Sequence, residues 1–208
     1  MNALKKQRTK SILRYTWPFY IVSAVLVAIL LNIIFRIAHP VPDYKTLTLF
    51  VTGETINPGK LRRELLEEFK EKELKTVSCI SSKPDAGDFN HKLTIAGYSS
   101  ADIFILTETK LNNIIVSDFA LPLEDELLNL YQGYSVYSKD DVKYGIKLNK
   151  EVVKEYFTLP EEDCYLIFNG KSVNTGKYSS TSIEEHDNAL TLVKNWGILC
   201  LKRKKKNM

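Results

Sequence analysis

The chain has 208 residues with 29 basic and 25 acidic side chains, and its formal net charge is +4. Residues 1–36 carry six Lys or Arg and no acid, and residues 202–206 carry five more. Residues 37–201 therefore hold 18 basic side chains against all 25 acidic ones, about −7. Because the basic excess lies in two tails and not on a domain face, it argues against nucleic acid as a partner.

Residues 17–35 (WPFYIVSAVLVAILLNIIF) contain no charged side chain. Nineteen helical residues at 1.5 Å each match a hydrocarbon core of roughly 30 Å. We therefore predict a cytoplasmic basic tail over residues 1–16, a transmembrane helix over 17–36 with Pro18 at its start, and a linker over 37–43. The positive-inside bias places the N-terminus in the cytoplasm and the rest of the chain outside, as a single-pass protein of the cell membrane.

Two alternatives for this apolar segment are less consistent with the sequence. A cleaved signal peptide has an apolar region of roughly 7–15 residues followed by a small-x-small site, and neither feature is present. A buried helix of a soluble protein would rarely lack charge for five turns. An uncleaved anchor is the preferred interpretation.

Residues 44–201 are long enough for one hydrophobic core but not for two full domains, and residues 202–208 form a second basic tail. Short apolar runs at 47–51, 75–80 and 101–106 predict strands, and the third is apolar on both faces, as in a central strand. Helices are expected between and after them. The first begins at Asn57 and Pro58, the second ends near Gly97, and Thr107 caps the third. Their expected inward residues are Leu61, Leu65, Leu66 and Phe69; Phe89, Leu93 and Ile95; and Leu111, Ile114 and Ile115.

The second half is less regular. Residues 121–130 lead from a short strand into an acidic helix, and residues 132–141 are predicted to be turns. Strands are predicted at 142–148 and 164–168, with a short helix from Asn149 to Phe157. Ser182 and Glu185 form a capping box for a last helix. The inward residues of that helix are expected to be Ala189, Leu190, Val193 and Trp196. The alternating order predicts an α/β domain with a mostly parallel sheet flanked by helices.

The strings LTLFVTGE, LLEEFKEK, LKTVSC, HKLTIA, ADIFIL and FALPLEDE follow one another over residues 47–126. Their order resembles the N-terminal lobe of extracellular solute-binding proteins of bacterial ABC importers, especially the carbohydrate-binding group. Tyr144, Gly145 and Ile146 resemble the Tyr-Gly-Ile-Pro strand of that family, with Lys147 in place of the proline. Residues 164–199 resemble its return segment. The resemblance implies one periplasmic-binding-protein-like lobe, a sugar-type solute and ABC permease subunits as partners.

The chain also departs from that family. Such proteins have two lobes that close on the ligand, whereas only about eighteen residues separate Gly145 from Cys164. Trp196 is the only tryptophan after the apolar segment, so stacking platforms for sugars are scarce. A transmembrane helix also replaces the usual lipid-anchored cysteine. A second lobe is therefore not expected.

Ligands of open parallel sheets lie beyond the C-terminal ends of the strands. Those ends should carry the candidate ligand-binding residues, and Glu54 and Glu108 among them could accept sugar hydroxyls. The same two acids are equally well placed to be ordinary helix N-terminal acids, which is the preferred interpretation. The full set is Thr52, Gly53 and Glu54 after the first strand, Ser81 and Ser82 after the second, and Thr107 and Glu108 after the third.

The sequence contains no pattern typical of a catalytic or metal-binding site. No nucleophile elbow or phosphate loop is present, and His91 and His186 fall in predicted helices away from any serine–carboxylate pair. The Cys and His spacing matches no metal site. Cys79 and Cys164 are expected to be two buried thiols, with a disulfide as the alternative. We therefore predict no catalytic residue, metal or cofactor.

The predicted function is a non-catalytic, membrane-anchored solute-binding-like module, an accessory to a sugar importer. The alternative is a structural or interaction protein of the cell envelope that uses a degenerate lobe as its partner surface. The predicted partners are the lipid bilayer, ABC permease subunits or another envelope protein, and a small solute such as a sugar.

Overall fold

The computed structural model describes residues 2–39, 41–72, 74–131, 134–180 and 186–196. The chain divides into two compact units, residues 1–41 and 42–208. The first unit consists of a single helix, α1 (Asn2–Ala38). Its segment Trp17–Phe35 has a mean hydropathy of 2.4 and no buried residue, so by length and composition the helix can cross a membrane. Pro18 was predicted to lie at the start of the helix, and this prediction is wrong: the helix begins at Asn2, before the apolar segment, so Pro18 lies inside it.

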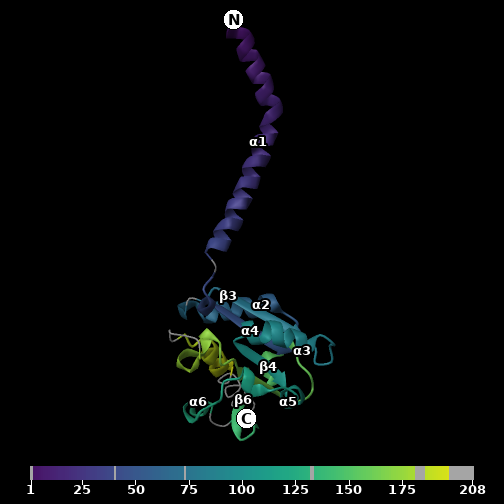
Figure 1. Ribbon diagram of the computed structural model, residues 1–208, viewed down its shortest axis with the longest axis vertical. Coiled ribbons are helices and arrows are strands. Elements are labelled where there is room, and N and C mark those ends of the chain that lie inside the picture. Colours follow the sequence, from purple (N-terminus) through teal and green to yellow (C-terminus); the bar gives the residue numbers. More distant parts are fainter. Residues whose placement is uncertain (1, 40, 73, 132–133, 181–185, 197–208) are drawn as a thin grey trace. The chain divides into compact units, whose positions relative to one another are not determined.

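The second unit is built on a mixed sheet of six strands among the described residues, in the order β3-β1-β4-β8-β6-β5. Three of these strands, β3, β4 and β6, are labelled in Figure 1. β3, β1 and β4 are parallel to one another, whereas β4–β8, β8–β6 and β6–β5 are antiparallel pairs. Four of the six strands, β3, β1, β4 and β6, therefore run in one direction, and the sheet is mostly parallel. The bounds are β1 (Thr46–Thr52), β3 (Thr76–Ser82), β4 (Ile103–Thr107), β5 (Val136–Lys139), β6 (Val142–Lys147) and β8 (Cys164–Phe168).

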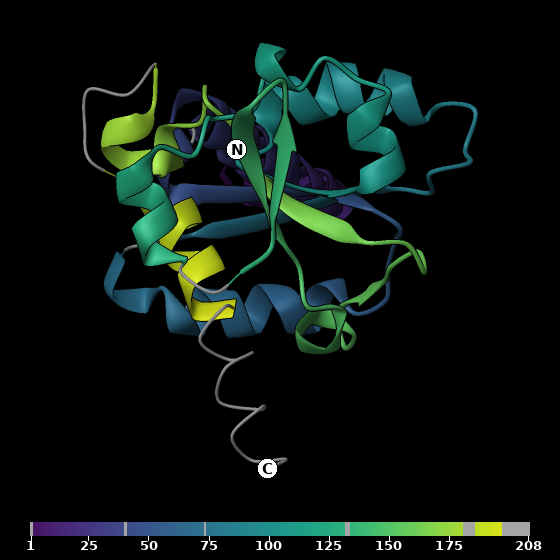
Figure 2. The ribbon, with the colours of Figure 1, turned by 90° about the horizontal axis from the view of Figure 1, so that it is seen from below.

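Helices cover both faces of this sheet (Figure 2). α2, α6, α7 and the helical residues 188–196 contribute to one core cluster, while α3, η3 and α5 contribute to the other. The helical bounds in the domain are η1 (Asp43–Lys45), α2 (Pro58–Glu68), η2 (Lys70–Lys72), α3 (Phe89–Lys92), η3 (Leu93–Gly97), α4 (Tyr98–Ser100), α5 (Glu108–Asn112), η4 (Val116–Asp118), α6 (Asp125–Leu130), α7 (Lys150–Val153) and η5 (Val173–Tyr178).

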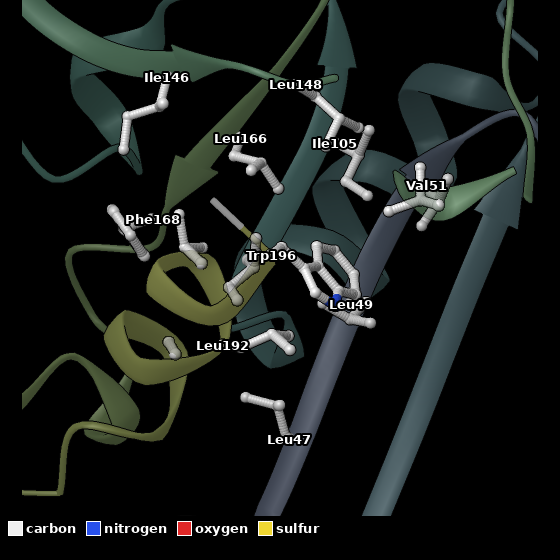
Figure 3. Close-up of a cluster of buried hydrophobic side chains, with 14 of the residues drawn as sticks. Leu47, Leu49, Val51, Ile105, Ile146, Leu148, Leu166, Phe168, Leu192 and Trp196 are labelled. Atoms are coloured by element: carbon white, nitrogen blue, oxygen red, sulfur yellow. The ribbon is translucent and has the colours of Figure 1, made fainter. Parts of the chain in front are cut away.

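Strand alternation assigns side chains to the two clusters, because successive residues of a strand point to opposite faces. Leu47 and Leu49 of β1 lie in the first cluster, while Phe50 lies in the second. Leu192 and Trp196 come from the helical residues 188–196 and lie over Leu47 and Leu49 (Figure 3). The predicted inward face of this last helix is confirmed at its buried positions, Ala189, Val193 and Trp196. The predicted capping box lies in residues 181–185, outside the described residues.

Two residues that were predicted to face inward are exposed instead. Phe89 and Leu93 are buried, but Ile95 is 60% exposed because it lies only two residues beyond Leu93, on the other side of the helix. Ile115 is 65% exposed because α5 ends at Asn112, before that residue. The Thr107 cap is confirmed, since its hydroxyl accepts a hydrogen bond from the Lys110 N–H at 3.4 Å.

Two strands occupy stretches that were predicted otherwise. Residues 132–141 were expected to be turns, but β5 lies within them and forms an edge of the main sheet. The helix expected from Asn149 to Phe157 ends at Val153, although the Asn149 side chain does cap it. Phe157 instead belongs to β7 (Phe157–Thr158), which pairs antiparallel with β2 (Glu54–Thr55).

Candidate functional site

Five of the predicted ligand-binding residues lie at the C-terminal ends of β1 and β3, and the other two, Thr107 and Glu108, lie at the end of β4. Thr52 is the register partner of Ser82, and the Gly53 N–H donates to the Ser82 carbonyl at 2.9 Å. Glu54 follows in β2, where its carboxylate forms an exposed ion pair with Lys83 at 2.7 Å. Thr52 and Ser82 are buried, and their hydroxyl groups have no hydrogen-bond partner among the described residues. Ser81 is half-buried beside them.

A segment of the chain itself lies against this edge. Gly53 has a φ of 149°, and a Cβ atom there would lie 2.3 Å from the carbonyl oxygen of Thr158. The backbone of β7 thus approaches the end of β1 as closely as glycine allows. The C-terminal end of β1 is therefore in contact with residues 158–159.

The end of β4 is contacted by the residues that follow β7. The Glu162 carboxylate accepts from the Thr109 hydroxyl at 2.6 Å and from the Thr109 N–H at 3.2 Å. Burial alone would raise the pKa of Glu162, but hydrogen bonds from Thr109 and Thr107 hold that pKa below its ordinary value. Glu108 donates its N–H to the Asp163 carbonyl at 3.0 Å, and its carboxylate accepts from the Tyr165 hydroxyl at 3.5 Å. Thr107 itself is fully buried.

A polar pocket of about 270 Å³ lies at the opposite end of the strands, where β1 and β4 begin. Its lining comes from the N-terminal ends of β1 and β4, from α4 and from the turn after β8. The lining residues are Asp43, Thr46, Thr48, Ser99, Ser100, Ala101, Asp102, Asn169, Lys171, Ser172 and Val173.

Asp102 is the central side chain of this edge and is only 6% exposed. One carboxylate oxygen accepts from the Thr48 N–H at 2.6 Å. The other oxygen accepts from the Ser172 hydroxyl and from the Asn174 side-chain amide, the latter at 3.0 Å. Asn188 extends the network, because its side-chain amide donates to the Asn174 side-chain oxygen at 2.9 Å. The carboxylate therefore joins β1, β4 and η5.

Burial raises the pKa of Asp102 to about 6, and the nearby charge of Asp43 adds to the rise. The hydrogen bonds from Ser172, Thr48 and Asn174 act in the opposite direction, because they favour the ionised form. A carboxylate with a shifted pKa beside a pocket is a candidate for a functional site, although structural groups also have shifted pKa values, so the shift alone does not identify a site.

The sequence reasoning missed this pocket. It placed the ligand at the C-terminal ends of parallel strands, whereas Thr48 and Asp102 lie near the N-terminal ends of theirs. The available signal was Asp102, an acid directly before a strand that is apolar on both faces. Asp is almost never fully buried unless it is partnered, so an acid at that position indicates a set of hydrogen-bonding partners around it.

The described cysteines are free thiols. Cys164 is buried, and burial raises its thiol pKa to about 11. Cys79 is half-buried, and its sulfur lies 3.3 Å from the Thr55 hydroxyl. Burial also raises the Cys79 pKa, so neither thiol has the lowered pKa of a reactive cysteine. Among the described residues no group of three or more His, Cys, Asp or Glu could hold a metal ion.

Comparison with known proteins found no matching family model, no matching curated protein and no matching solved structure. The fold and site define an α/β domain with a mostly parallel sheet and a polar pocket at one sheet edge, in a chain whose N-terminal helix can span a membrane.

Proposed function

We propose that the chain is a non-catalytic binding module, held at the cell membrane by α1 and displayed outside the cytoplasm. The observation that carries this proposal is the segment Trp17–Phe35, whose apolar side chains have no protein cover in the structure. Such a surface is stable in hydrocarbon and costly in water. The basic residues before it favour a cytoplasmic N-terminus.

Within this proposal, the module is a single lobe of the solute-binding type and an accessory to an ABC-type sugar importer. The order of strings over residues 47–126 and the parallel β3-β1-β4 unit support this relationship. The sheet edge where such proteins bind their ligand is, however, contacted by Thr158 and Glu162. This contact favours the second candidate, an envelope interaction protein in which the lobe serves as a partner surface.

The orientation predicts the outcome of proteolysis. We expect protease added to intact cells that express the full chain to remove an epitope at Met208 and to spare one at Met1, because the bilayer shields only the cytoplasmic tail. Immunoblotting of both epitopes measures this, and permeabilised cells, in which both are cleaved, are the control. Protection of the Met208 epitope in intact cells would refute the proposed exposure.

The covered strand ends predict weak sugar binding. In calorimetry on the full chain in lipid nanodiscs, we expect no mono- or oligosaccharide to bind with a Kd below about 10 μM, or roughly −7 kcal/mol. High-affinity sites commonly bury 70–90% of the ligand surface, which an open and partly occupied edge does not do. A tighter sugar would contradict this expectation. Glu54→Ala and Glu108→Ala would then test whether it binds at the strand ends.

A further inference from the structure

The two edges of the main sheet differ in how they are protected from other strands. Short edge strands, lysines and bulges are features that keep a sheet edge from pairing with another chain. β5 has four residues, ends in Lys139 and has a register shift after Tyr137. β3 has seven residues (TVSCISS), with no charged side chain and no proline. The β5 edge is therefore protected, whereas the β3 edge has none of these features.

Alternate backbone groups of β3 point away from the sheet. In β1, Thr48 accepts a hydrogen bond from the Asp102 N–H at 2.8 Å, so its backbone faces β4. On the other side of β1, the Gly53 N–H donates to the Ser82 carbonyl at 2.9 Å. Because backbone groups alternate along a strand, Ser82 and every second residue before it face β1. The residues of β3 that direct their N–H and C=O groups outward are Val77, Cys79 and Ser81.

These outward groups are unpaired. In the described part of the chain, no hydrogen bond reaches the backbone N–H or C=O of any of the three residues. Residues 78–81 are half-buried, as expected of a strand that has a neighbour on one side only. An unpaired edge of this kind accepts a further strand through main-chain hydrogen bonds. The β3 edge is therefore a candidate interface.

The arrangement of the outward groups matches a second copy of β3 that runs antiparallel. The three outward residues are symmetric about Cys79, so a two-fold axis at that residue places it opposite the partner's Cys79. Val77 then lies opposite the partner's Ser81. In this register the outward residues form hydrogen-bonded pairs, each of which exchanges both N–H···O=C bonds. The three outward N–H and three outward C=O groups of each strand are then all bonded.

The charges near β3 are compatible with this pairing. β3 is uncharged, so no like charges oppose each other along the paired strands. Beyond the strand ends, Lys75 comes opposite the partner's Lys83, and Lys83 already forms an ion pair with Glu54 at 2.7 Å. The anchor favours a second copy over a soluble partner, because two chains held in one membrane have a raised effective concentration.

We propose that two copies of the chain pair along β3, antiparallel and centred on Cys79, so that their six-stranded sheets form one continuous sheet. The inference deepens the proposed function by naming a second copy as the partner of the binding module. It rests on that function in one respect, which is that α1 holds both copies in the same membrane.

Cysteine cross-linking tests the register. Residues of a hydrogen-bonded antiparallel pair have Cα atoms about 5.5 Å apart, a distance that a disulfide spans. The full chain with Cys200→Ser is reconstituted in phosphatidylcholine vesicles, oxidised with copper phenanthroline and oxygen, and separated on a non-reducing gel. We expect covalent dimers through Cys79, in which oxygen takes up the two protons and two electrons that the two thiols lose. Absence of Cys79 dimers would overturn the proposal.

The protected edge provides the matched control. Ser138→Cys, in a chain that also carries Cys79→Ser and Cys200→Ser, places an exposed thiol in β5. It should cross-link at least about tenfold less than Cys79, because cysteines whose Cα atoms are more than about 7 Å apart cannot be bridged without backbone movement. Equal cross-linking of the two edges would indicate random collisions and would overturn the proposal.

A proline tests whether the outward backbone groups carry the pairing. Ser81→Pro removes an outward N–H and no hydrogen bond to β1, and proline is tolerated at such positions of edge strands. The variant keeps Cys79 as its reporter and should cross-link about tenfold less, because two-fold symmetry removes two hydrogen bonds from the interface. Denaturant unfolding checks that the domain remains folded. Unchanged cross-linking in a folded Ser81→Pro chain would contradict the pairing.

The comparison of Cys79 with Ser138→Cys decides the proposal even if Ser81→Pro impairs folding. Failure of the proposed function is distinguishable from failure of the pairing. A protected Met208 epitope combined with efficient Cys79 cross-linking would refute the extracellular placement alone. An exposed Met208 epitope without Cys79 cross-linking would refute the pairing alone.

Discussion

Ile103→Asp is expected to abolish cooperative folding of the α/β domain, whereas Ile95→Asp should change its stability by no more than about 0.5 kcal/mol. Ile103 lies in β4 at the centre of the sheet with 0% exposure, between β1 and β8. An unpaired carboxylate there costs several kcal/mol, and the lost apolar contacts add to that cost. The sum of about 4 kcal/mol or more approaches the whole stability of a domain of this size.

The measurement is denaturant unfolding of the full chain in detergent, followed by tryptophan fluorescence. Trp196 is buried in the first core cluster, so its emission reports the domain, while Trp17 in α1 contributes a background common to all variants. Ile95→Asp makes the same chemical change at an exposed position and is the control. A wild-type transition retained in Ile103→Asp would refute the central position of β4.

The parallel half of the domain could be predicted from the sequence because its signals are local. β1, α2 and β3 each coincide with a short apolar run or an amphipathic repeat, and Pro58 marks the start of α2. The direction of β8 could not be predicted in the same way. The string CYLIF predicts a strand, but its antiparallel pairing with β4 depends on the path of the chain over residues 108–163. β5 was missed because VYSK has only one buried residue and no apolar alternation.

The candidate sites show the same division between local and distant signals. Strand ends follow from strand positions, so Thr52 and Ser82 could be expected to meet. The segment that contacts these strand ends could not be predicted, because the pairing of Glu54 with Thr158 joins residues about a hundred positions apart. The Asp102 pocket combines residues from η1, β1, α4, the two residues before β4 and the segment after β8, and no short window of sequence contains them. Irregular segments such as 169–173 also lack the periodicity that identifies strands and helices.

The raised pKa of Asp102 predicts an unusual dependence of stability on pH. Its folded-state pKa of about 6 lies above the ordinary value of 3.8, so between these values the folded state binds more protons than the unfolded state. This contribution to stability is fully present below pH 3.8 and is lost as the pH rises through about 6. A shift of roughly two units corresponds to about 3 kcal/mol. The other carboxylates of the chain include ones with lowered pKa, such as Glu162, whose contribution has the opposite sign, so the effect must be isolated by comparison.

The variant Asp102→Asn isolates the contribution of Asp102 to the pH dependence of stability, because Asn does not titrate. The variant should be destabilised at every pH, since its amide nitrogen replaces an acceptor that faces donors from Thr48, Ser172 or Asn174. The loss of unfolding free energy relative to the wild type should be largest at pH 4 and smaller by about 3 kcal/mol at pH 7.5, because only the wild type then has an ionised carboxylate in a buried position.

Denaturant unfolding of the full chain at pH 4, 5, 6 and 7.5 measures this deficit in unfolding free energy, and Asp85→Asn, at an exposed position, is the control. A deficit that stays constant with pH, or grows as the pH rises, would show that the Asp102 carboxyl has an ordinary or a lowered pKa in the folded state. The network would then be an ordinary set of hydrogen bonds to an ionised carboxylate.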